Sequence, residues 1–175
     1  SVPFRDSPES WVEIFNRGDH VVDLTGWRLD EGIDYRFAAG RMLSPGGYLV
    51  VARDVGQVQS LHPGIDVVGP FANQLSKRGD DIVLKDPNNN PADEVHYYGG
   101  GRWPEYPGGL GSSLELRDPN ADNSKAEAWA ASDESGKSSW QVYSYRGPAT
   151  PGASGQPTTW NDFVFGLLAA GECLI

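Results

Sequence analysis

Hydrophobic and polar residues alternate over short segments along most of the chain, a pattern that predicts β-strands. In the first segment, WVEIFN at residues 11–16, Val12 and Ile14 occupy every second position, as a strand with one buried face requires. Similar segments follow at 20–24, 27–30, 34–38, 48–53, 65–69, 81–86, 93–98 and 112–117. Short strands at such spacing predict an all-β fold, a sandwich or a barrel.

Glycine- and proline-rich turns separate these strands, and the chain holds 22 Gly and 13 Pro among its 175 residues. In SPGG at residues 44–47, proline sets φ for a turn and a glycine takes the positive φ that follows. One segment, DVGQVQSLHP, instead predicts a short helix that has Val55, Val58 and Leu61 on one face and ends at Pro63.

Composition divides the chain into three parts. Residues 1–147 carry the predicted strands and form the expected β-sandwich. Residues 148–159 are rich in proline, glycine and small polar residues, which is typical of a linker. Residues 160–175 are apolar with strand-like alternation, so we expect this tail to be the truncated first strand of a following β module.

Charge and hydropathy argue against two classes of partner. The net charge is −10 and no basic patch interrupts it, so nothing in the sequence is suited to neutralising nucleic-acid phosphates. The longest apolar run, residues 163–170, is far shorter than the ~20 residues that a membrane span needs. The single cysteine, Cys173, has no partner for an internal disulfide.

Four blocks in this order resemble the lamin-tail domain in its bacterial form: WVEIFNRGDHVVDLTGWRLDE, FAAGRMLSPGGYLVVARD, VVGPFANQLSKRGDDIVLKDPNNNPADEVHYY and GSSLELRDPNADNSKAEAWAAS. Together they cover roughly residues 8–146. The resemblance implies an immunoglobulin-like β-sandwich. It also implies a non-catalytic interaction or spacer module within a larger exported or cell-surface bacterial protein, where it is extracellular and binds a protein or surface partner.

Aromatic residues gather around a glycine- and proline-rich loop, YYGGGRWPEYPGG at residues 97–109. Exposed aromatic rings on a rigid sandwich stack on sugars or anchor a protein partner, so the loop is a candidate binding site and a carbohydrate-binding module is the alternative function. In the other interpretation the rings only cover the open end of the sandwich. The candidate binding residues are Tyr97, Tyr98, Arg102, Trp103 and Tyr106.

The segment that follows the last predicted strand carries a partial calcium-loop pattern. Asp118, Asn120 and Asp122 match the first three ligand positions, but Asn123 stands where the loop needs glycine and Trp129 where it needs glutamate. Two interpretations remain: a weak calcium site, or a turn in which Asp and Asn side chains bind the backbone two residues on.

No known catalytic motif is present, and the sequence predicts that the chain is not an enzyme. His20, His62 and His96 lie far apart and have no metal-ligand spacing. Glu13 and Asp23 remain a carboxylate pair whose separation the sequence does not define. No cofactor is expected apart from the weak calcium site.

The apolar tail also suggests a route to self-association. The lamin-tail pattern has a strand before its WVEI block, where this chain has only SVPFRDSPE, so we expect a vacant sheet edge. The tail at 160–175 is expected to add to that edge in its own or a second copy, and the second case gives a dimer by strand exchange.

Overall fold

A computed structural model of the chain describes residues 10–104 and 112–133. Nearly every element in these ranges is a strand, in agreement with the predicted all-β fold. The elements in chain order are β1 (Trp11–Phe15), β2 (Val22–Asp23), β3 (Arg28–Glu31), β4 (Ile33–Arg36), β5 (Met42–Leu43), β6 (Tyr48–Ala52), α1 (Val55–Leu61), β7 (Val67–Val68), β8 (Ala72–Asn73), β9 (Gly79–Lys85), β10 (Pro91–Tyr98), β11 (Leu114–Leu116), the 3-10 helix η2 (Ala126–Ala128) and β12 (Trp129–Ala131).

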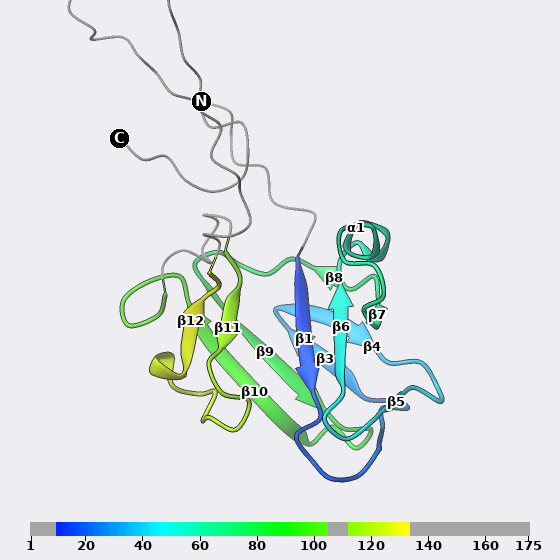
Figure 1. Cartoon of the computed structure of the whole chain (residues 1–175). Helices are drawn as coiled ribbons and strands as arrows, with labels where there is room; N and C mark the ends of the chain where they lie inside the picture. The colour runs from blue at the N-terminus through cyan, green and yellow to red at the C-terminus, as the bar shows by residue number, and fades with distance from the viewer. Residues whose placement is uncertain (1–9, 105–111, 134–175) are drawn as a thin grey trace, which may run out of the picture. The chain divides into compact units, whose positions relative to one another are not determined.

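Two main sheets face each other and form a sandwich (Figure 1). One has the strand order β10-β9-β3-β4-β8 and the other the order β1-β6-β7, in which β7 runs parallel to β6. Two smaller antiparallel pairs, β2–β5 and β11–β12, accompany them. The predicted sandwich is therefore confirmed, while the two- and three-residue strands β5, β8 and β12 were not predicted.

The core lies between the sheets and draws residues from both. Leu29 and Ile33 of one sheet and Leu49 and Val51 of the other are at most 1% exposed. Val12, Ile14, Ile82 and Leu84 pack against this cluster from its margins. The alternation predicted for residues 11–16 is thus confirmed, because Val12 and Ile14 face inward while Trp11 and Glu13 are exposed.

Asn16, just after β1, joins two turns through its buried side chain. Its Nδ2 donates hydrogen bonds to the carbonyls of Leu43, at 3.0 Å, and His20, at 2.8 Å, while its Oδ1 accepts one from the backbone of Gly18 at 3.0 Å. The backbone of Asn16 also pairs with the turn before β6, whose Gly46 has a φ of 66° as the SPGG pattern predicts. This amide therefore anchors the β1–β2 loop to β5, although the sequence does not single it out.

Helix α1 lies where the sequence predicts it and begins at a capping residue. The Asp54 side chain accepts a hydrogen bond from the backbone of Gln57 at 2.9 Å, which satisfies one free N–H of the first turn. Val58 packs with Val50 and Ala52 of β6, so the helix covers part of the outer face of that sheet. Leu61, at the end of the helix, is 53% exposed and lies outside this small cluster.

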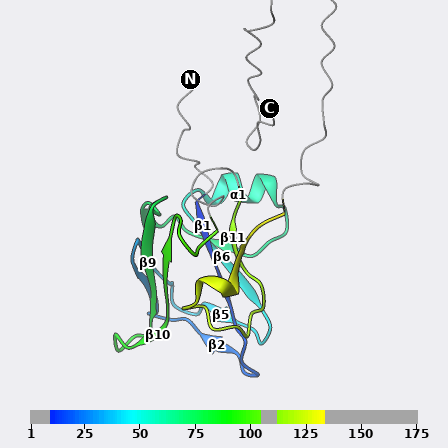
Figure 2. The same cartoon turned by 90° about the vertical axis from the view of Figure 1, so that its left-hand side faces the viewer.

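The β11–β12 hairpin lies beside β10 (Figures 1 and 2) and is joined to the main sandwich by side chains. The Trp129 ring lies next to that of Trp103, and Asn123 donates to both carboxylate oxygens of Asp93 in β10, at 2.9 and 3.0 Å. Trp129 Nε1 in turn donates to the Asn123 carbonyl at 2.9 Å, so the loop before η2 is held from both sides.

The chain divides into a unit of residues 1–132 and a second unit of residues 133–175, of which the structure describes only Asp133. The predicted linker at 148–159 and the tail at 160–175, with its extension strand and its proposed edge pairing, lie outside the described residues. So do the last part of the predicted domain at 1–147 and the segment SVPFRDSPE. In the described ranges, no helix has the length and apolar character to cross a membrane.

Candidate functional site

The outer face of the five-stranded sheet carries a dense set of polar side chains. Strand register places opposite residues on the same face, so Glu94 lies beside Val83, and His96 beside Asp81. Towards the centre of the sheet, Arg28 of β3 lies opposite Lys85 of β9. The inward positions of these strands, among them Leu29, Ile82 and Leu84, pack on the core, so the polar residues that alternate with them face away from it.

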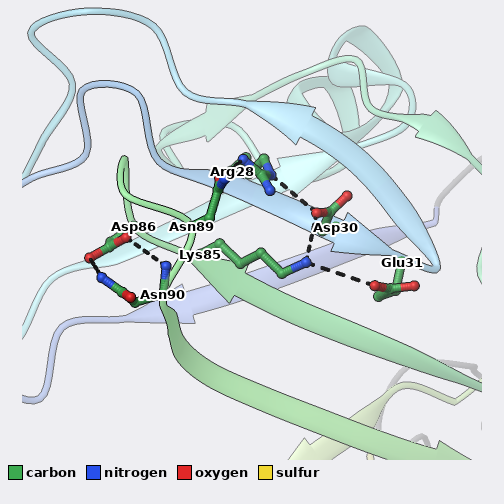
Figure 3. A network of polar contacts seen from close by, with 7 residues as sticks. All are labelled: Arg28, Asp30, Glu31, Lys85, Asp86, Asn89 and Asn90. Carbon is green, nitrogen blue, oxygen red and sulfur yellow. Dashed lines mark hydrogen bonds and ion pairs between the residues drawn. The ribbon is translucent and has the colours of Figure 1, made fainter.

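Charges at the centre of this face are paired with one another (Figure 3). Asp30 Oδ2 accepts a hydrogen bond from Lys85 Nζ at 2.9 Å and another from Arg28 Nε at 3.1 Å. Lys85 Nζ also lies 3.8 Å from Glu31 Oε1, and Arg28 reaches Asn89 in the β9–β10 turn. The hydrogen bonds from Lys85 and then Arg28 lower the pKa of Asp30, so this network remains ionised and holds β3 against β9.

Next to this network the face is hollowed and acidic. A hollow of about 520 Å³ is lined by the carboxylates of Glu31, Asp81 and Glu94, together with His96 and Ser124. The Asp81 carboxylate contacts His96 Nδ1, and both side chains are about half exposed. Glu31 adopts a φ of 75°, a region that residues with a Cβ seldom occupy, and it does so at the tight β3–β4 turn before Gly32.

A second hollow, of about 410 Å³, adjoins the first at Ser124. Tyr98 of β10 forms one wall; its side chain is 53% exposed and its ring lies 4.6 Å from that of His96. Arg102 and Lys125 also line this hollow, where Arg102 pairs with Glu127. We call the two adjoining hollows together the β10 groove: the first is its acidic end, and the second, which holds the exposed Tyr98 ring, is its aromatic end.

The predicted aromatic site divides between this groove and the interior. Tyr98 and Arg102 are exposed in the groove, whereas Trp103 is only 8% exposed, contrary to what a free sugar-stacking platform requires. Tyr97 faces the other way, its hydroxyl donating to the Ser76 carbonyl at 2.8 Å; burial and then the charge of Asp80 raise its pKa. Tyr106 lies outside the described residues. Trp103 thus fits the interpretation in which the rings cover the open end of the sandwich.

The partial calcium pattern forms two consecutive turns. Asp118 accepts a hydrogen bond from the Asn120 backbone at 2.8 Å, and Asp122 accepts one from the Ser124 backbone at 3.1 Å, as Asx turns do. Asp122 also binds the Ser124 hydroxyl and lies 3.0 Å from Lys125 Nζ. These contacts, with the Ser124 hydroxyl first, lower the pKa of Asp122 to about 2. The carboxylate is therefore engaged by the protein itself, as the turn interpretation predicts.

The remaining candidate residues do not converge. Glu13 lies on β1 and Asp23 on β2, where Asp23 accepts hydrogen bonds from the backbone and hydroxyl of Thr25. Of the three histidines, His96 lies in the β10 groove, and His20 contacts only the neighbouring Asp19 among charged groups of the described residues. In residues 10–104 and 112–133 no group of three His, Cys, Asp or Glu side chains is placed to hold a metal ion.

The chain matches the model of a known protein family. The model of the family described as Lamin Tail Domain matches residues 3–99. Among curated proteins, no sequence matches the chain. The matched segment runs from before β1 to the end of β10 and therefore includes the two main sheets and one wall of the β10 groove.

Proposed function

Since the chain belongs to the lamin tail domain family of immunoglobulin-like modules, we propose that it is a non-catalytic interaction module of a larger exported or cell-surface protein. Its partner in this proposal is a protein, bound on the outer face of the five-stranded sheet. The fold alone does not define the function, and the surface that the fold presents is what supports this proposal.

The observation that carries the proposal is the β10 groove. Its acidic end lies mainly on β9 and β10, its aromatic end on the turn after β10 and on residues 124–127, and it combines an exposed tyrosine with unevenly distributed charge. Exposed aromatic side chains anchor protein partners, and charged groups around them direct and orient the encounter. The alternative of a carbohydrate-binding module that uses the loop around Trp103 has less support, because Trp103 is only 8% exposed.

Site-directed photo-crosslinking in the producing cells tests this proposal. A crosslinking amino acid replaces Tyr98 in the groove and, in the matched control, Leu61 on α1, which is equally exposed at 53%. We expect one discrete crosslinked product from position 98 and none from position 61. Equal products from both positions, or none from either, would contradict the proposal.

The extracellular location is tested separately. Protease added to intact cells should cleave the protein before the cells are lysed, whereas a cytoplasmic marker should stay whole. If the protein and the marker are cleaved only after lysis, the proposed location is wrong, and a groove partner would then have to be sought inside the cell.

A further inference from the structure

The acidic end of the β10 groove has a carboxylate that the rest of the fold does not use. Glu94 lines the hollow, and among the described residues no hydrogen bond or ion pair engages its carboxylate. Asp81, on the neighbouring strand, contacts only His96 among ionisable side chains of the described residues, and Glu31 meets Lys85 only at 3.8 Å. Two of the three carboxylates thus lack a permanently cationic partner in the described part of the chain.

The Asp30 carboxylate in the neighbouring network differs from these, because it is paired with cationic side chains (Figure 3). Asp30 has two cationic neighbours, while Lys85 and Arg28 are both committed to it. Arg28 and Lys85 therefore neutralise Asp30 at the centre of the sheet, while Arg102 and Lys125, in the other hollow, are paired with Glu127 and Asp122. The groove at the β9–β10 edge keeps an excess of negative charge, in a chain whose net charge is −10.

The surroundings of these carboxylates suit a segment of polypeptide. Val83, which shares the outer face with Glu94, also lines the hollow and can contact the aliphatic stem of a long side chain. Tyr98 and His96 extend the same wall with two exposed rings, and a tyrosine face attracts a neighbouring cation. Lysine and arginine combine an apolar stem with a cationic head. The stem can contact the apolar and aromatic lining of the groove while the head lies against its carboxylates.

We propose that the acidic end of the β10 groove binds a basic, extended segment of a partner protein, with lysine or arginine side chains placed against Glu94 and Asp81. This inference rests on the proposed function and names the chemical class of its partner. The segment runs along the outer face of β10 towards Tyr98, and its affinity falls as salt screens the exposed charges.

The test measures binding of a fluorescent peptide in which lysine alternates with threonine, using fluorescence anisotropy and the full chain. A peptide of equal length with glutamate in place of lysine is the first control. We expect the lysine peptide to bind at low ionic strength and to weaken at least tenfold at about 0.15 M salt. The glutamate peptide should not bind.

Two sets of variants then locate the site. Glu94→Gln, which removes no contact among the described residues, should weaken binding several-fold, and Glu94→Gln with Asp81→Asn at least tenfold. The control double variant Asp19→Asn with Asp34→Asn removes the same charge at exposed positions outside the groove and should change affinity less than twofold. Equal losses in both double variants would show that binding follows net charge, and the inference would be wrong.

The peptide-binding result is also compared with the result of the crosslinking experiment. A crosslinked partner at position 98 with no binding of the lysine peptide would overturn this inference and leave the proposed function standing. Absence of both would overturn the two together. Melting curves of each variant show whether it is folded. If the variants with Asp81→Asn unfold, the affinity of Glu94→Gln for the lysine peptide tests the inference by itself.

Discussion

The indole rings of Trp103 and Trp129 lie with their centroids 6.1 Å apart and their planes inclined by 37°. Trp103 lies in the turn after β10, and Trp129 is the first residue of β12 in the β11–β12 hairpin. Both lie beyond residues 3–99, the segment that the family model matches. Since Trp103 is 8% exposed, this contact extends the packed structure of the domain past the matched segment.

We expect Trp103→Ala to lower the free energy of unfolding by about 3 kcal/mol, because removal of a buried indole leaves a cavity and exposes the facing ring. Tyr98→Ala, at a side chain that is 53% exposed, should change it by less than about 0.5 kcal/mol. Urea denaturation followed by tryptophan fluorescence compares the two. A Trp103→Ala protein as stable as the wild type would mean that this ring is not part of the core.

Asn16→Ala tests the amide that joins the β1–β2 loop to β5. The substitution leaves the Leu43 carbonyl, in a buried environment, without its donor, and we expect a loss of about 2 kcal/mol in stability. Asn88→Ala, at an exposed turn position, is the matched control and should lie within about 0.5 kcal/mol of the wild type. Denaturant midpoints that coincide for both variants would contradict the role assigned to Asn16.

Much of the fold can be predicted from the sequence, because the long strands carry enough residues to show a period. The five residues of β1 alternate clearly, and Asp54 and Pro63 mark the limits of the helix. Strands β5 and β8 have two residues each, too few for any period, so only pairing with distant strands defines them.

Less of the candidate site can be predicted from the sequence. Tyr98 and Arg102 were predicted from the aromatic loop, but the acidic end of the groove was not. The alternation of Glu94, His96 and Tyr98 in DEVHYY offers a signal that these three share one face. Nothing local indicates that Asp81 and Glu31 lie beside them, because strand register and the β3–β4 turn bring them there. The burial of Trp103 depends likewise on Trp129, which belongs to a hairpin much further along the chain.

Two adjacent glycines at the end of β10 should respond very differently to an added methyl group. A Cβ on Gly99 would lie 2.1 Å from the Lys77 carbonyl oxygen and 3.1 Å from Arg78 Cα, so the backbone of one strand would have to move. A Cβ on Gly100 would meet no atom within 4 Å. We expect Gly99→Ala to destabilise the fold by about 1–3 kcal/mol and Gly100→Ala by much less. Thermal melts of the two variants decide, and equal melting temperatures would contradict this account.

The pKa of Glu13 on β1 predicts a pH-dependent effect of opposite sign to the usual one for a carboxylate. Partial loss of hydration and then the charge of Glu115 on β11 raise its pKa above the ordinary value of 4.5. The folded state therefore binds the proton more tightly than the unfolded state does, and ionisation of Glu13 destabilises the fold. This destabilisation is fully present above the raised pKa and disappears below about pH 4.5.

Glu13→Gln should accordingly raise the melting temperature at pH 7, and the gain should vanish as the pH is lowered through 4.5. Glu115→Gln should give a smaller gain in the same window, because its charge is the lesser cause. Asp23→Asn provides a control of opposite sign: its hydrogen bonds with Thr25 lower its pKa, so the variant should be less stable at pH 7, and its deficit should shrink as the pH falls below 3.8. A gain for Glu13→Gln that is the same at pH 7 and at pH 4 would show that it arises from the uncharged amide itself, and the coupling between β1 and β11 would have no part in it.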